Sequence, residues 1–119
     1  MSELQIQTKV FQYFWNNFPE TRYMLFHVPN GGKRNIREAM SLKSSGVIAG
    51  ISDFIFIWNK RVYGIEIKIE KGVLSSEQKK VHHVWRSNGI NTYICYGYDQ
   101  TIKAITDIIY GRDLETRTN

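Results

Sequence analysis

Residues 50–69 read GISDFIFIWNKRVYGIEIKI, two apolar runs separated by the pair Asn59-Lys60. This pair favours a tight turn, so the segment predicts a β-hairpin. Successive side chains of a strand point to opposite faces, which places Glu66 and Lys68 together on one face of the second strand. The opposite face carries Ile65, Ile67 and Ile69. Because the strand is apolar enough to be buried, and buried charge is unfavourable without a partner or a metal, the two charged residues need an explanation.

A second acid lies opposite this pair. Asp53 stands at the start of the first strand, across the predicted hairpin from Glu66. Two carboxylates that converge in this way repel each other unless a cation lies between them. Carboxylate oxygens suit Mg²⁺ or Mn²⁺, which takes one or two protein carboxylates and keeps waters for a substrate phosphate. The alternative is an ion pair between Glu66 and Lys68 on a solvated sheet face, which would contribute little and carry no chemistry.

Three motifs follow one another along the chain: GVIAGISD at 46–53, EIK at 66–68 and LSSEQ at 74–78. Together they resemble the virus-type replication-repair nuclease (VRR-NUC) domain, a branch of the PD-(D/E)xK nucleases. The resemblance extends over nearly the whole chain, because Asn-Gly-Gly at 30–32 and an opening helix with Glu3 and Gln7 also fit the family's order. Ser52 stands where the family usually has proline. That proline shapes the turn and ligates nothing, so the difference does not change the expected chemistry.

The resemblance implies an α/β fold with a restriction-endonuclease-like core, in which helices flank a central mixed sheet. It also implies that Asp53, Glu66 and the main-chain carbonyl of Ile67 hold Mg²⁺ or Mn²⁺. Such a cation lowers the pKa of a bound water and polarises a phosphoryl oxygen. Lys68 would orient the attacking water or stabilise the transition state, and it could act as a base if burial depresses its pKa.

Gln78 and Glu3 each have two interpretations. Ser75 and Gln78 have the spacing of a capping box, which by itself accounts for the glutamine. The family places a glutamine at this position against the active site, where its amide can hold a water or a phosphate oxygen. Glu3 lies in the first turn of a predicted helix, where an acid complements the helix dipole. The resemblance would instead bring Glu3 to the metal site as a further catalytic residue.

The charge of the chain suits a polyanionic partner, since the formal net charge is +5 and the pI is near 9.4. Four basic residues lie just before the hairpin: Lys33, Arg34, Arg37 and Lys43. A solvated face is the usual explanation of such a run. Beside a phosphodiester site, contacts to DNA backbone phosphates are the interpretation that we favour.

The substrate is expected from the resemblance alone. Stand-alone domains of this family resemble Holliday junction resolvases, homodimers that nick four-way junctions, whereas the corresponding domain of larger relatives acts as a monomer on flaps. A chain of 119 residues fits the stand-alone type, so we expect a homodimeric endonuclease for branched DNA. Apolar residues of the first or last helix could form the interface or belong to the core. The rival hypothesis is a non-catalytic DNA-binding or architectural protein, whose binding would need no metal.

Length and composition indicate one globular nuclease domain at 1–111 and a polar tail at 112–119. The hydrophobic content of 42% is too high for a disordered chain. Cys95 is the single cysteine, which excludes a disulfide within the chain and favours a buried strand residue. We find neither a signal peptide nor an apolar run that could span a bilayer. The sequence therefore predicts a soluble protein of the cytoplasm, in a bacterium or a phage-infected cell.

Periodicity and turn residues predict a helix at 2–18, a strand at 23–28, a turn at 29–32, a basic connector with helical potential at 33–45, hairpin strands at 54–58 and 62–69, a helix from 75 or 76 to 88, a strand at 92–97 and a helix at 100–110. Asp99 is expected to cap the last helix and Gly111 to follow its end. Gly50 suits a tight turn or a close backbone approach to a ligand. His27 is expected to be a core or edge histidine, because no second histidine has metal spacing to it.

Overall fold

The computed structural model describes residues 1–29 and 35–113. Its elements are α1 (Glu3–Asn17), the 3-10 turn η1 (Pro19–Thr21), β1 (Leu25–His27), α2 (Ile36–Ser44), β2 (Phe54–Trp58), β3 (Arg61–Lys68), α3 (Ser76–Ser87), β4 (Asn91–Tyr96) and α4 (Gly97–Ile109). None of the described helices is long and apolar enough to cross a membrane.

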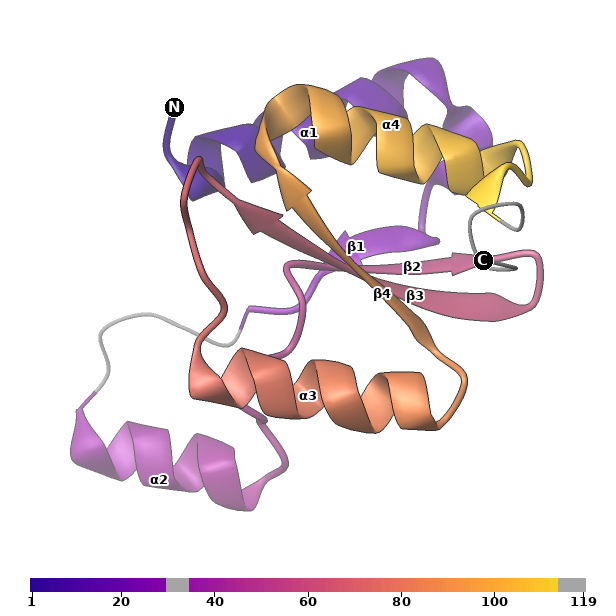
Figure 1. Ribbon diagram of the computed structural model, residues 1–119. Helices are drawn as coiled ribbons and strands as arrows, with labels where there is room; N and C mark the ends of the chain where they lie inside the picture. The colour runs from indigo at the N-terminus through magenta and orange to yellow at the C-terminus, as the bar shows by residue number, and fades with distance from the viewer. Residues whose placement is uncertain (30–34, 114–119) are drawn as a thin grey trace.

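The four strands form one mixed sheet in the order β1-β2-β3-β4. β1 pairs with β2 and β2 with β3 in antiparallel fashion, whereas β3 and β4 run parallel and are connected through α3. In Figure 1, α1 and α4 cover one face of the sheet and α3 covers the other. The expected α/β fold with a central mixed sheet between helices is therefore confirmed.

The β2–β3 hairpin forms where it is predicted. Trp58 pairs with Arg61, so the loop contains only Asn59 and Lys60. Both have positive φ, 50° and 66°, which is the backbone of a type I′ turn. This turn fixes the register of the two strands, and with it the side of the sheet on which each side chain of β3 lies.

The main core lies between the sheet and the pair α1 and α4. It contains Ile6, Val10, Phe14, Leu25, Phe54, Phe56, Tyr63, Ile65, Ile67, Cys95, Ile105 and Ile108. Ile65 and Ile67 of β3 are fully buried in it, so Glu66 and Lys68 must face α3. Ile69 was expected to join them, and this is wrong, because β3 ends at Lys68 and Ile69 is exposed.

On the other face, α3 approaches the sheet closely where β3 lacks a side chain. A Cβ added to Gly64 would lie 3.0 Å from Cζ3 of Trp85 and 2.7 Å from Oγ of Ser52. Gly64 therefore leaves the space that the indole ring of α3 occupies. Val81 and His82 are the buried residues of this helix.

The last helix differs from its predicted start. α4 begins at Gly97, and its N-cap residue Tyr96 makes no side-chain cap, so the expected cap by Asp99 is wrong. Instead, the Gln100 side chain accepts a hydrogen bond from the Tyr96 N–H at 2.9 Å. Gly111 follows the C-cap residue with φ 75°, as predicted.

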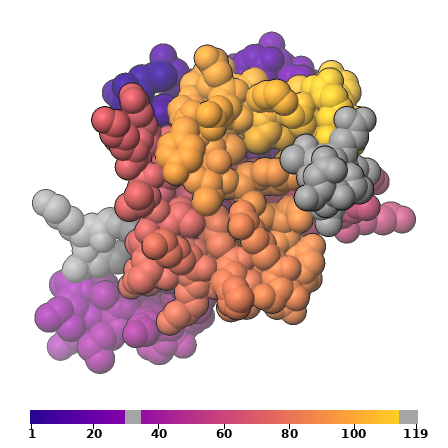
Figure 2. Space-filling view, viewed as in Figure 1, coloured from indigo at the N-terminus to yellow at the C-terminus, as the bar shows by residue number. Residues whose placement is uncertain are grey.

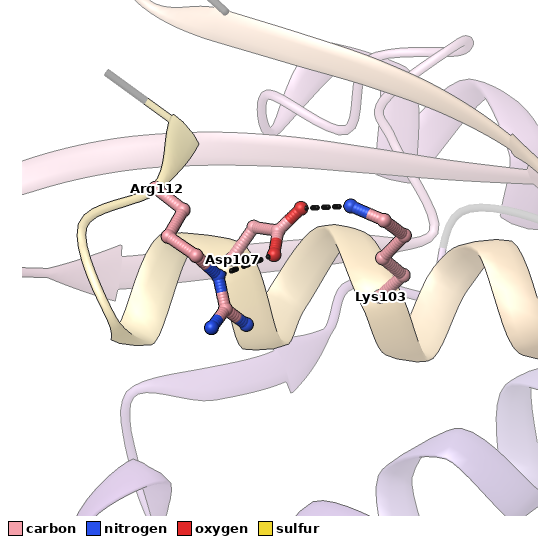
Figure 3. A network of polar contacts seen from close by, with 3 residues as sticks. All are labelled: Lys103, Asp107 and Arg112. Atoms are coloured by element: carbon pink, nitrogen blue, oxygen red, sulfur yellow. Dashed lines mark hydrogen bonds and ion pairs between the residues drawn. The ribbon is translucent and has the colours of Figure 1, made fainter. Parts of the chain in front are cut away.

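The chain remains packed beyond the end of α4. Figure 3 shows the Asp107 carboxylate between Lys103 and Arg112. Its Oδ2 lies 2.6 Å from Nζ of Lys103, and its Oδ1 lies 2.9 Å from Nε of Arg112. Partial burial would raise the pKa of Asp107, but the hydrogen bonds from Lys103 and Arg112 outweigh it and lower that pKa. Asp113 is buried and accepts a hydrogen bond from the Tyr63 hydroxyl at 3.1 Å.

Candidate metal and catalytic site

Two charged side chains are buried at the centre of the α3 face of the sheet. Glu66 is only 2% exposed and Lys68 only 9% exposed, although both carry groups that water solvates strongly. Charged residues are almost never buried to this extent unless they are paired or bind a metal. The solvated ion pair, the alternative explanation of this pair, does not fit the observed burial.

Asp53 is fixed beside them by the backbone of β3. Phe54 pairs with Ile65, so Asp53, one residue earlier, stands opposite Glu66 in the antiparallel register. Its Oδ2 accepts a hydrogen bond from the Ile67 N–H at 2.7 Å. The carboxylate therefore has one defined position next to Glu66 and next to the peptide group of Ile67. The expected convergence of the two acids is what the hairpin register produces.

Asp53 raises the energy of the charged form of Glu66. Burial raises the pKa of Glu66 to about 8, the negative charge of Asp53 adds to this, and the positive charge of Lys68 opposes it. Burial also raises the pKa of Asp53, although the hydrogen bond from the Ile67 N–H lowers it in part. A carboxylate pair in this state gains from a shared proton or from a cation.

Gln78 caps α3 and contacts Glu66 with the same amide, whereas its expected contact with a water or a phosphate oxygen stays a prediction. Its Oε1 accepts from the Ser75 N–H at 2.8 Å and the Ser75 Oγ accepts from the Gln78 N–H at 3.1 Å, which completes the capping box of α3. Its Nε2 donates to Oε1 of Glu66 at 2.7 Å. The cap thus orients the amide, and the amide holds one oxygen of the buried carboxylate.

The other oxygen of Glu66 is the feature that fits a metal. Oε2 is buried and has no hydrogen-bond partner among the described residues. An unpartnered carboxylate oxygen beside a second carboxylate is a donor set that Mg²⁺ or Mn²⁺ prefers. Within residues 1–29 and 35–113, no group of three or more His, Cys, Asp and Glu side chains could hold a metal. A cation at this place would take Asp53, Glu66 and backbone or water oxygens as ligands, and the expected ligation by Asp53, Glu66 and the Ile67 carbonyl stays a prediction.

Glu3 lies near the acids without joining them in such a cluster. It occupies the first turn of α1 and is partly exposed. Its charge contributes to the raised pKa of both Asp53 and Glu66, which places it on the same side of the molecule. Both interpretations of Glu3, the helix-dipole acid and the catalytic residue, remain compatible with this position.

Of the predicted basic residues, the two that the structure describes are not joined to the carboxylates. Lys33 and Arg34 lie outside the described residues. Arg37 and Lys43 lie on α2, whose residues are all exposed or only partly buried, and no hydrogen bond or ion pair of the described chain joins them to Asp53 or Glu66. In Figure 2 the purple atoms of α2 lie at one corner of the molecule.

Two residues support the site in ways that the sequence does not reveal. The His27 ring is exposed on β1, and its Nδ1–H donates to the Asp53 carbonyl oxygen at 2.6 Å. Gly50 has φ 91°, and a Cβ there would lie 2.5 Å from the backbone carbonyl of Glu77 and 2.8 Å from the Gln78 nitrogen. The close approach at Gly50 is therefore to the first turn of α3, whereas the sequence suggested a tight turn or an approach to a ligand.

Comparison with known proteins gives one family and one fold. The model of the VRR-NUC domain family matches residues 3–99, a range that contains every predicted catalytic residue. A solved chain named "VRR_NUC domain protein" superposes with a TM-score of 0.79 over 92% of this chain and 89% of that chain, at 24% sequence identity. The curated proteins contain no match.

Proposed function

Because the chain belongs to the VRR-NUC domain family, nucleases of the PD-(D/E)xK type, we propose that it is a metal-dependent endonuclease that hydrolyses phosphodiester bonds of branched DNA. The observation that carries this proposal is the buried carboxylate of Glu66 beside the partly buried Asp53. Glu66 has one oxygen held by Gln78 and one without a partner, and its pKa is raised. A purely structural role gives no reason to bury one acid beside another.

Each residue of the site has a proposed role that follows from its position. Asp53 and Glu66 would hold Mg²⁺ or Mn²⁺, which supplies charge neutralisation and a more acidic water. The Ile67 N–H keeps Asp53 in place, and Gln78 keeps Glu66 in place. Lys68 brings a positive charge to the same face of β3, where it stabilises the negative charge that develops on the phosphate.

Cleavage of defined DNA substrates tests the activity. End-labelled four-way junction, flap and linear duplex are incubated with Mg²⁺, with Mn²⁺ and with EDTA. We expect metal-dependent cleavage by the unaltered chain. Asp53→Asn should lose it, because its amide nitrogen is a poor metal ligand, yet it keeps an oxygen for the Ile67 N–H and should therefore fold. Cleavage retained by Asp53→Asn, or DNA binding without cleavage under all conditions, would contradict the proposal, and the latter would favour the non-catalytic DNA-binding protein.

We further propose that the chain acts on four-way junctions as a homodimer in the bacterial or phage-infected cytoplasm. Two copies related by a two-fold axis would place one site on each of two symmetric strands. The apolar residues of α1 and α4 are largely used in the core, for example Val10 and Ile105. α2 is different: it has nine residues, none is buried, and Ile36 and Met40 are 78% and 66% exposed.

A helix of this length is marginal in water unless its apolar side chains are covered. The exposed Ile36 and Met40 of α2 therefore support α2 as the surface that contacts the second copy. In the same assay, paired nicks in the junction would support the two-fold arrangement. Equal or faster cleavage of flaps would favour the flap nuclease instead.

A further inference from the structure

A basic pocket of about 480 Å³ lies beside the carboxylates, between α3 and β4. Its polar lining comes from one side of α3: Lys79, His82, His83, Arg86 and Ser87. Leu74, just before α3, and Ile94, on β4, form its apolar part. None of these described lining residues is an acid, and Lys79 and Arg86 give the pocket positive charge.

The buried imidazole of His82 lines this pocket and has no hydrogen-bond partner among the described residues. The side chain is only 4% exposed, and neither Nδ1 nor Nε2 has a hydrogen-bond partner among the described residues. Burial and the neighbouring charge of Arg86 lower the pKa of His82, so the ring is neutral and offers one N–H donor. A buried donor that remains unpaired is unfavourable, so a ligand or water that accepts from it is expected.

Arg86 is held in one orientation by β4. Its Nε donates to Oγ1 of Thr92 at 2.6 Å and its Nη2 donates to the Thr92 carbonyl at 2.7 Å. A guanidinium has five N–H groups, so these two bonds leave donors that can bind an anion. Because Thr92 already fixes the side chain, little rotamer entropy is lost when an anion binds.

The pocket lies next to the carboxylates in the fold. Ile94 pairs in register with Glu66 across the parallel strands β3 and β4, which places the two side chains on the same face about 5 Å apart along the sheet. Lys79 directly follows Gln78, the residue that holds Glu66. A DNA strand with one phosphate at the carboxylates carries a further phosphate charge at every neighbouring nucleotide.

We propose that this pocket binds a backbone phosphate of the DNA strand, next to the phosphate that is cleaved. Lys79, His83 and Arg86 contact the phosphate oxygens, His82 donates to one of them, and the sugar packs on Leu74 and Ile94. The proposal rests on the nuclease function proposed above. A metal does not suit this pocket, because Lys79 and Arg86 repel cations and none of the described lining residues is a carboxylate.

Binding of labelled branched DNA, measured by fluorescence anisotropy in EDTA at several salt concentrations, tests the pocket without cleavage. Lys79→Ala should weaken binding several-fold and reduce the slope of log affinity against log salt by about one. Lys80→Ala is the matched control, since it removes the same charge from the next residue of α3, which does not line the pocket. Equal losses in the two variants would show a general charge effect and overturn the proposal.

NMR of the histidine rings provides a second measurement that does not depend on the variants. The unaltered protein is titrated with a short single-stranded oligonucleotide, with thymidine 5′-phosphate and with inorganic phosphate. The oligonucleotide should shift the His82 and His83 resonances at the lowest concentration. If thymidine 5′-phosphate is as effective, the ligand is a free nucleotide and not a DNA strand, and if no ligand shifts His82, the pocket is not a phosphate site.

The two proposals fail separately. Metal-dependent cleavage without a shift of His82 would remove the phosphate pocket and keep the nuclease. A shift of His82 by DNA without cleavage of any substrate would remove the catalytic activity and keep the pocket.

Discussion

Gln78 shows how one side chain can cap a helix and also orient a buried carboxylate. Its amide oxygen caps α3 and its amide nitrogen holds Glu66, at 2.8 and 2.7 Å. The two groups of an amide are fixed relative to each other, so the cap determines where the N–H points. The first turn of α3 therefore positions a carboxylate that belongs to β3.

Substitution of Gln78 and Ser75 separates these functions. Gln78→Glu keeps an oxygen for the Ser75 N–H but loses the donor to Glu66, so we expect cleavage to slow by about 10- to 100-fold, as for groups that orient metal ligands. Ser75→Ala loses the hydroxyl cap and should cost about 1 kcal/mol in unfolding free energy, with a smaller effect on cleavage. Single-turnover cleavage rates measure the effect on activity, and urea unfolding measures the effect on the unfolding free energy. Equal losses of activity in the two variants would refute this separation.

Glu66 should make the metal-free protein less stable as the pH rises. Its folded pKa of about 8 lies above the ordinary value of 4.5, so the folded chain holds this proton more tightly than the unfolded chain. The resulting stabilisation is complete below the ordinary pKa and is lost as the pH rises through the folded pKa. In EDTA, the unfolding free energy of the unaltered chain should fall over this range relative to Glu66→Gln, whose amide does not titrate.

Mg²⁺ should oppose this loss, because a cation binds the deprotonated pair. Urea unfolding with and without Mg²⁺, above and below the folded pKa of Glu66, measures the effect. A pH dependence that is unchanged in Glu66→Gln would mean that another group causes it.

At the level of the elements, two glycines connect the loop before β2 with the helices on either side. Gly46 follows α2 with φ 106°, and Gly50 precedes β2 with φ 91°. A Cβ at Gly46 would meet nothing within 4 Å, whereas a Cβ at Gly50 would collide with the backbone of Glu77 and Gln78. Gly46 is therefore needed only for its positive φ, whereas Gly50 is also needed because α3 packs directly against it.

The two glycines therefore make a matched pair of substitutions. Gly46→Ala should cost about 1 to 2 kcal/mol in unfolding free energy, because alanine disfavours positive φ. Gly50→Ala should cost more and should also slow cleavage, since the turn that carries Gln78 must move. Urea unfolding and single-turnover cleavage test this. If Gly50→Ala cleaves as fast as Gly46→Ala, the contact with α3 does not control the site.

For the whole molecule, α2 is the element that the fold leaves uncovered. The sheet shares its main core with α1 and α4, and α3 buries Val81 and His82 on the other face, while α2 has exposed apolar side chains and no buried residue. If these side chains contact a second copy, the dimer contact and the proposed DNA-binding residues Arg37 and Lys43 are on the same helix. Dimerisation would then place two basic helices side by side beneath one branched substrate.

Light scattering tests the dimer directly. The chain mass is 14.0 kDa, and we expect about twice that mass in solution for the unaltered protein. Met40→Glu should give single chains of unchanged stability, because Met40 is exposed on α2. Leu4→Glu, which alters an exposed apolar residue of α1, should leave the mass unchanged. A monomer at cleavage-competent concentrations would remove the two-fold model, and dissociation by Leu4→Glu alone would move the contact to α1.

Local features of the chain were predictable because they depend on residues close together in the sequence. The Asn59-Lys60 turn, the alternation that opposes Glu66 to Ile65, the Ser75–Gln78 capping box and the glycine after α4 are all of this kind. The place of Asp53 opposite Glu66 follows from the same hairpin register. The resemblance to the nuclease family rests on the motifs at 46–53, 66–68 and 74–78 in this order.

Other features depend on how distant elements enclose one another, and only the fold shows them. The raised pKa of Glu66 requires burial under α3, and the bond from Gln78 Nε2 requires that helix to pass beside β3. The pocket around His82 exists because β4 returns parallel to β3 and places Ile94 next to Glu66. Desolvation and such contacts are properties of the enclosed space, which no local pattern of residues encodes.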